Sequence, residues 1–146
     1  MIGNSSLNIQ TILGIDPGRD KCGVAIMGSD YKIAYHQIID SFYAIATVQK
    51  LVTEFAIDLI VMGDGTTCKM WQQQIESIAT MPVVTIDETN STLQARDRYW
   101  IMYPPKGLQR MIPQGLRVPP RPVDDIVAIL LIERYLVFNR EPLSNG

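Results

Sequence analysis

The chain has 146 residues, enough for one domain with a hydrophobic core but too few for two. Apolar residues make up 47% and charged residues 19%, and no apolar run is long enough to span a membrane. The net charge of −2 argues against a protein that coats nucleic acid non-specifically, although it allows a local basic patch. Cys22 and Cys68 are too few for a disulfide framework or a zinc site, which favours a reducing, cytoplasmic location.

The ends of the chain differ from its middle. The first ten residues have neither the basic start nor the apolar stretch of a secretory signal. We expect a flexible N-terminus over 1–10, a single domain over 11–140 and a flexible C-terminus over 141–146.

Two apolar runs separated by a turn open the domain. The run 12–15 stops at Asp16, Pro17 and Gly18 force a turn, and a second run covers 23–27. A carboxylate at the end of a buried strand is costly to desolvate unless it has a partner such as a cation. Asp-Pro-Gly is also good turn chemistry, so both interpretations of Asp16 stay open.

A third strand, over 32–39, follows a turn at Ser29 and Asp30 and completes a predicted antiparallel meander. His36, the single histidine, lies within it. A histidine in the middle of a strand is more often a residue of a sheet face or edge than a catalytic one, and we favour that role.

The rest of the chain alternates between helical and strand patterns. The predicted elements are a helix from Asp40 or Ser41 to about Phe55, a strand over 58–63, a helix over 68–79, a strand over 82–86, a helix over 91–102 capped by Thr89 or Asn90, an irregular segment over 103–121 and a helix over 123–138. This order predicts an α/β fold with a mixed five-stranded sheet, a meander of three strands plus two parallel strands, and helices on both faces.

Acidic side chains stand where three of these strands end and where the last helix begins. They are Asp16, Asp64, Asp87 with Glu88, and Asp124 with Asp125. If the three strands are parallel neighbours, their ends meet at one edge of the sheet. Carboxylates brought together cannot all stay ionised without cations, and hard oxygen ligands select Mg²⁺ or Mn²⁺. Two such ions roughly 4 Å apart can promote phosphodiester cleavage.

Each of these acids also has a structural interpretation. Asp64 suits a turn, Asp87 or Glu88 can accept hydrogen bonds from the next helix, and Asp124 and Asp125 can complement a helix dipole. The structural role is favoured for Asp64 and Asp125, and both roles stay open for the others.

The segment 96–121 is basic in an acidic chain, with Asp97 as its one acid. Its basic residues are Arg96, Arg98, Lys106, Arg110, Arg117 and Arg121. A loop as long as 103–121 in a small domain is usually functional or mobile.

Three segments resemble one family. Asp-Pro-Gly-Arg-Asp-Lys-Cys-Gly-Val-Ala at 16–25, Asp-Glu-Thr-Asn-Ser-Thr-Leu-Gln-Ala-Arg at 87–96 and Val-Asp-Asp-Ile-Val-Ala-Ile-Leu-Leu-Ile at 123–132 are similar, in order, to motifs of the YqgF/RuvX family. That family is RNase H-like, is related to Holliday-junction resolvases and is described as processing pre-16S rRNA. Pro17 stands where Phe is usual, as in the RuvC-type motif, and Thr89 stands where Arg is usual.

The resemblance implies an RNase H-like fold with catalytic carboxylates Asp16, Glu88 and Asp124. We expect Mg²⁺ or Mn²⁺ to be held by these three with Asp87 and with Asp64, the extra acid in Gly63-Asp64-Gly65. Nucleic acid would be bound by the basic residues, namely Lys21, Arg96, Lys106, Arg110, Arg117 and Arg121. Tyr99 or Trp100 could stack on bases, although helix packing is the favoured role for both.

The expected function is therefore metal-dependent endonucleolytic cleavage of structured nucleic acid, either precursor 16S rRNA or branched DNA. RNA versus DNA stays open, as does a homodimer. The main alternative is a non-catalytic nucleic-acid-binding protein with the same fold. A lobe of an actin or sugar-kinase ATPase is a further rival, but those proteins need two lobes. A structural partner protein without chemistry is consistent with the net charge.

Overall fold

The computed structural model describes the backbone over residues 8–65 and 68–144 and the side chains over 8–65 and 68–139. Of the flexible ends that we predicted, residues 1–7 and 145–146 lie outside these ranges. The last helix continues to Ser144, beyond the predicted end near Phe138.

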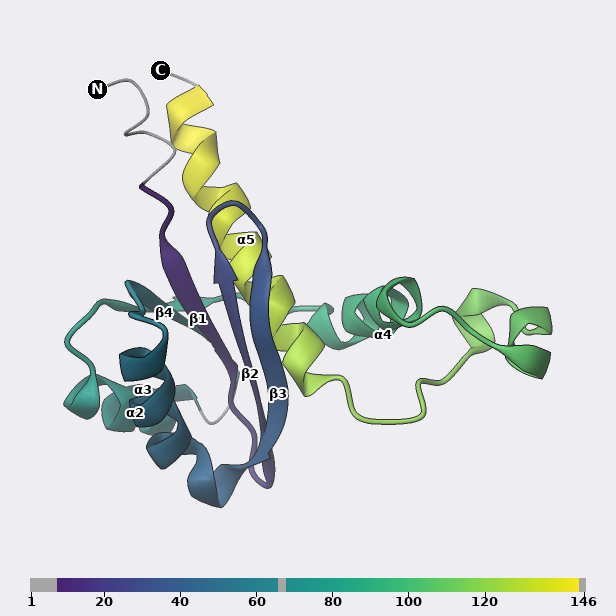
Figure 1. Ribbon diagram of the computed structural model, residues 1–146, viewed down its shortest axis with the longest axis horizontal. Helices are drawn as coiled ribbons and strands as arrows, with labels where there is room; N and C mark the ends of the chain where they lie inside the picture. The colour runs from purple at the N-terminus through teal and green to yellow at the C-terminus, as the bar shows by residue number, and fades with distance from the viewer. Residues whose placement is uncertain (1–7, 66–67, 145–146) are drawn as a thin grey trace.

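One mixed sheet forms the centre of the molecule (Figure 1). Its strands are β1 (Thr11–Asp16), β2 (Lys21–Gly28), β3 (Ile33–Asp40), β4 (Leu59–Gly63) and β5 (Val83–Ile86). They lie in the order β3-β2-β1-β4-β5, with β1 antiparallel to β2 and parallel to β4, and with β5 parallel to β4. The predicted sheet is confirmed, and the ends of β1, β4 and β5 do share an edge.

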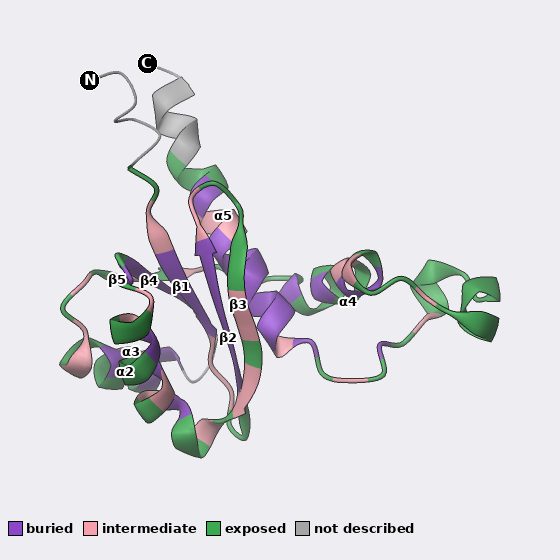
Figure 2. Ribbon diagram, in the orientation of Figure 1, coloured by how far each residue is buried: buried purple, intermediate pink, exposed green. Residues whose placement is uncertain are grey.

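Alternating side chains of the strands feed two separate cores. Ile12 and Val61 face one core, whereas Leu13 and Ile60 face the other. The helices divide between these faces: α2 (Ala44–Glu54) and α3 (Cys68–Ile78) cover one, and α4 (Ser91–Met102) and α5 (Asp124–Ser144) cover the other. The short 3₁₀ turn η1 (Ser41–Tyr43) leads from β3 into α2. The central strands β1, β2 and β4 are buried between these layers, whereas the edge strands β3 and β5 are partly exposed (Figure 2). The prediction of helices on both faces is confirmed.

Helix α5 approaches the sheet closely because two glycines face it. A Cβ atom on Gly23 would lie 1.9 Å from the carbonyl oxygen of Asp124, and one on Gly14 would lie 2.5 Å from that of Ala128. No side chain fits in either place. The glycines therefore set where α5 begins relative to the ends of β1 and β2.

Residues 103–121 form an arm that extends away from the sheet beyond α4 (Figure 1). The arm contains two short 3₁₀ turns, η2 (Gly107–Met111) and η3 (Gln114–Leu116), and is exposed over most of its length (Figure 2). Among the described helices, none has the length and apolar character needed to cross a membrane.

Candidate active site

Asp16 and Asp124 meet at the edge where β1 ends. In the sheet, Asp16 pairs with Gly23, and Gly23 lies against the backbone of Asp124. The two carboxyl groups come within hydrogen-bonding reach of each other, although 107 residues of chain separate a strand end from a helix start. The close packing of α5 on the sheet thus creates the pair.

The environment of this pair opposes full ionisation. Burial, reinforced by the negative charges of Asp124 and Glu88, raises the pKa of Asp16 to about 8. Burial also raises the pKa of Asp124, with a further contribution from Asp125. At neutral pH the two groups share a proton, so that they titrate as one coupled unit.

Glu88 brings a third carboxylate to the same edge from the segment that follows β5. Its side chain lies over the loop after β4, where a Cβ atom on Gly63 or Gly65 would come within 2.2 or 2.1 Å of its carboxylate oxygens. Burial and the nearby charges of Asp64 and Asp87 raise its pKa, whereas Arg134 lowers it. Glu88 is therefore held beside the pair and interacts with Asp16 through its charge.

Asp87 and Asp64 take structural roles in this arrangement. Asp87 Oδ1 accepts hydrogen bonds from the Thr89 amide at 2.9 Å and the Thr89 hydroxyl at 2.6 Å, and these bonds lower its pKa. Asp64 Oδ1 accepts a hydrogen bond from the Glu88 amide at 3.3 Å. Of the two neighbouring acids at the end of β5, Glu88 is thus the one coupled to Asp16.

Arg134 is a residue that the sequence did not single out. From α5 it donates hydrogen bonds to the carbonyl oxygens of Asp87, at 2.6 Å, and Thr89, at 2.8 Å, and to Gln94 Oε1 at 2.9 Å. Arg134 thus brings a cation to the acidic loop, which is formed by Asp87, Glu88 and Thr89. In the family that the motifs resemble, an arginine usually stands at the position of Thr89. No local pattern around Arg134 signals this role.

Asp125 belongs to a buried network of its own. It is 3% exposed and bonds to His36 Nδ1 at 2.6 Å and to Arg121 Nη1 at 3.0 Å. Although burial opposes ionisation, the bonds from Arg121 and His36 keep its pKa below the usual value. The network ties β3 and the base of the arm to the start of α5, which supports structural roles for Asp125 and His36.

The predicted nucleic-acid-binding residues divide into two groups. Arg121 pairs with Asp125, and Arg117 Nε donates to the carbonyl oxygens of Gln109, at 3.1 Å, and Ile112, at 2.8 Å. These two arginines stabilise the arm from within. The exposed members are Lys21 at the start of β2, Arg96 on α4, and Lys106 and Arg110 on the arm.

Arg96 is the exposed cation placed beside the acids. It lines a small hollow of about 220 Å³ with Arg121 and Asp124.

Tyr99 and Trp100 are buried and pack edge to face, with ring centroids 5.0 Å apart. Their helix-packing role is therefore confirmed.

The acids fit a divalent cation only in part. Asp16 and Asp124 are paired oxygen donors of the kind that Mg²⁺ and Mn²⁺ prefer. In the part of the chain that the structure describes, however, no three His, Cys, Asp or Glu side chains lie close enough to hold an ion together. Glu88 would have to turn from the Gly63–Gly65 loop toward Asp16 to become a third ligand.

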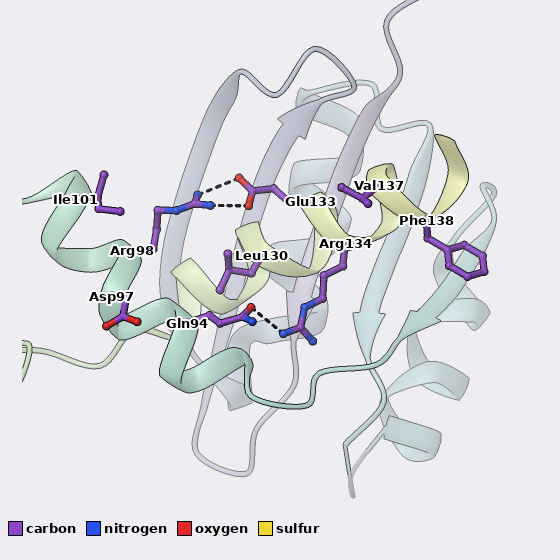
Figure 3. A pocket seen from close by; sticks show the side chains of 9 residues that line it. All are labelled: Gln94, Asp97, Arg98, Ile101, Leu130, Glu133, Arg134, Val137 and Phe138. Carbon is purple, nitrogen blue, oxygen red and sulfur yellow. Dashed lines mark hydrogen bonds and ion pairs between the residues drawn. The ribbon is translucent and has the colours of Figure 1, made fainter. Parts of the chain in front are cut away.

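A groove between α4 and α5 is separate from these carboxylates. Its lining includes the exposed side chains of Ile101, Val137 and Phe138 and the ion pair between Arg98 and Glu133, 2.7 Å apart (Figure 3). None of Asp16, Glu88 and Asp124 lines it. The groove is thus a distinct surface on the outer side of these two helices.

Comparison with known proteins supports the fold and leaves the sequence family open. No family profile matches the chain, and no curated protein matches its sequence. Among solved structures, Thermus thermophilus RuvC matches with a TM-score of 0.61 and 14% identity, over 90% of this chain and 96% of that one. A ROK family protein from Streptococcus pneumoniae TIGR4, determined with sucrose, matches over 65% of this chain and 39% of its own, with 19% identity and a TM-score of 0.44. YeaZ from Pseudomonas aeruginosa matches over 64% and 49%, with 16% identity and a TM-score of 0.42.

The likeness to RuvC extends along nearly the full length of both chains. Together with the strand order and the helices on both faces, it shows the fold class. The chain has the α/β, RNase H-like fold that it shares with RuvC.

Proposed function

We propose that the chain is a nuclease that uses Mg²⁺ or Mn²⁺ to cleave structured nucleic acid, with Asp16, Glu88 and Asp124 as its catalytic carboxylates. One observation carries the proposal: Asp16 at the end of β1, Asp124 at the start of α5 and Glu88 after β5 lie at one edge of the sheet, where burial, reinforced by the charges of Asp124 and Glu88, raises the pKa of Asp16 to about 8. Such an arrangement costs stability, and strongly perturbed groups of this kind concentrate at functional sites. The resemblance of the three motifs to the YqgF/RuvX family and the RuvC-like fold support the same conclusion.

In this proposal each residue has a defined task. Asp16 and Asp124 would hold the cation between them, and Glu88 would complete the site. When bound, the cation supplies Lewis-acid activation for phosphodiester hydrolysis. Arg96, beside Asp124, would hold a phosphate of the substrate, and Arg134 would keep the loop that carries Glu88 in place.

The substrate would be precursor 16S rRNA or branched DNA, the two classes that the family resemblance suggests. Exposed Lys21, Lys106 and Arg110 would add phosphate contacts away from the acids. The homodimer stays a prediction.

The second candidate function is a nucleic-acid-binding protein of the same fold without catalysis. The observation that favours it is that the described side chains do not form a three-ligand group. Both functions predict binding, so cleavage decides between them.

The test is cleavage of a branched DNA and a precursor 16S rRNA with Mg²⁺, Mn²⁺ or EDTA. We expect cleavage with a divalent cation, and a loss of at least about a hundredfold in Asp16→Asn, Glu88→Gln and Asp124→Asn, because even outer partners of a metal site are worth about 10–100-fold. Asp97→Asn, exposed on α4, is the matched control and should retain activity. Binding without cleavage would establish the second function, and cleavage that survives Asp16→Asn would contradict the assigned site.

A further inference from the structure

The tip of the arm exposes two large apolar side chains on one side of a short turn. Leu108 is 82% exposed and Met111 is 81% exposed. Both belong to η2, and in a 3₁₀ turn residues three apart lie one above the other. Leu108 and Met111 therefore form a single apolar projection, which is costly to keep in water without a partner.

The charges around this projection indicate the chemistry of the partner. From Arg98 to Val123 the chain has five basic residues and no acid. Arg117 and Arg121 are engaged within the arm and at its base, whereas Lys106 and Arg110 are exposed on either side of Leu108. An apolar projection flanked by cations complements a polyanion that also offers flat apolar surfaces, which is the chemistry of stacked bases between phosphate backbones.

Hydrogen bonds and a cation–π contact join the arm to itself and to the core. Arg117 bonds to the carbonyl oxygens of Gln109 and Ile112, which joins the returning limb of the arm to η2. Its guanidinium lies 5.9 Å from the ring centroid of Trp100, which is buried in α4. At the base, Arg121 bonds to buried Asp125. The tip is thus connected to the core through specific contacts.

The returning limb of the arm leads to the carboxylate edge, which is the edge of the sheet that carries Asp16, Glu88 and Asp124, and the other limb is joined to this edge through the length of α4. The helix before the arm, α4, begins three residues after Glu88, and the helix after it, α5, begins at Asp124. Arg96 and Arg121 line the hollow beside Asp124. A nucleic acid that reaches these acids therefore passes the base of the arm.

We propose that the arm inserts Leu108 and Met111 into the base stack where a nucleic-acid duplex is branched or interrupted. This inference rests on the proposed function only in taking nucleic acid as the substrate. Unstacking costs least at such interruptions, so the insertion selects branched or bulged structures over continuous duplexes. Lys106 and Arg110 hold the flanking phosphates and contribute affinity without selectivity.

The test measures binding in EDTA, so that cleavage plays no part. The probes are a four-way DNA junction, a bulged RNA duplex and continuous duplexes of matched length, each with 2-aminopurine beside the interruption or at the equivalent position. For wild type we expect about tenfold or greater preference for an interrupted structure and a rise in 2-aminopurine fluorescence, because inserted side chains unstack the neighbouring base. The DNA and RNA probes show which nucleic acid is preferred.

Two double variants separate the apolar from the basic contribution. Leu108→Ser with Met111→Ser should reduce the preference to about twofold or less and abolish the fluorescence rise, with binding to continuous duplex unchanged. Lys106→Gln with Arg110→Gln should weaken all probes alike and reduce the slope of log K against log salt by about 2. Met70→Ser, at an exposed apolar residue of α3, is the control for loss of apolar surface elsewhere.

Exposure of the mutated side chains predicts unchanged melting temperatures, so folding does not confound the comparison. A preference that survives the Leu108–Met111 double substitution overturns the proposal, as does a wild type that binds all duplexes equally. So does a variant whose sole defect is in self-association or in binding to anionic phospholipid vesicles. Absence of any nucleic-acid binding contradicts the proposed function as well, whereas equal binding to interrupted and continuous probes contradicts the insertion alone.

Discussion

The carboxylate edge and the arm meet at the start of α5 but differ in how their side chains are held. At the edge, every group is held by a contact from another element: Asp16 by the register of β1 and β2, Asp124 by the close approach of α5, and Glu88 by the loop after β4. On the arm, Leu108 and Met111 project into solvent. Packing contacts fix the side chains of the edge, whereas the distinguishing feature of the arm tip is its solvent-exposed apolar side chains.

This difference indicates where each region tolerates change. Holding carboxyl groups together in a buried edge lowers the free energy of unfolding, so substitutions there should change the stability of the fold and its dependence on pH. An exposed tip contributes little to the core, so substitutions there should change interactions and leave stability alone. A glycine on the arm, and a carboxylate and an arginine on α4, allow matched comparisons with residues of the edge.

The largest difference in stability should come from adding a methyl group at one glycine of each region, Gly23 at the edge and Gly115 on the arm. In Gly23→Ala the new Cβ would lie 1.9 Å from the Asp124 carbonyl oxygen, so we expect a loss of about 3 kcal/mol or more, at the upper end for overpacking. Gly115→Ala, with no atom within 4 Å, should be neutral or stabilising by about 0.5 kcal/mol. Urea denaturation measures both, and similar losses would contradict the contrast between the regions.

A smaller effect is expected from removing the charge of Asp16. Its raised pKa means that the folded state keeps a proton that the unfolded state loses, so the stability of wild type should fall as pH rises from about 4 to about 8. Asp16→Asn removes that slope and should be more stable than wild type at pH 8 by roughly 1–3 kcal/mol, and much less so at pH 5.

This comparison is made by urea denaturation in metal-free buffer at both pH values. Asp97→Asn, at an exposed residue of α4, is the control and should follow wild type. Parallel pH profiles for wild type and Asp16→Asn would show that folding does not raise the pKa of Asp16.

The smallest effect should distinguish Arg134 from Arg98, two of the arginines that connect α5 to its surroundings. Arg134→Met removes three hydrogen bonds at the acidic loop and should cost about 1–2 kcal/mol. Arg98→Met removes the partly exposed ion pair with Glu133 and should cost about 0.5–1 kcal/mol. Hydrogen exchange adds a local readout, since amides of residues 87–91 should exchange faster in Arg134→Met alone. Equal exchange rates for the amides of residues 87–91 in both variants would show that Arg134 does not hold this segment in place.

Much of the fold was predictable because its signals are local. Apolar runs, the turn at Pro17 and Gly18, and helical spacing act over a few residues, and the observed strands and helices begin close to the predicted positions. The parallel placement of the strands that end at Asp16, Asp64 and Asp87 followed from the strand–helix alternation, and it is confirmed. The error at the end of α5 reflects the weakness of helix-stop signals after Phe138.

The sequence by itself therefore determined the elements, their order and the set of acids at one edge. The tertiary structure decided which acids interact: Asp124 beside Asp16, Asp125 in a network with His36, and Glu88 rather than Asp87. It also supplied Arg134, whose acceptor Asp87 is 47 residues away along the chain. Secondary structure follows from interactions between near neighbours, whereas these pairings depend on how closely α5 packs on the sheet, which no local pattern encodes.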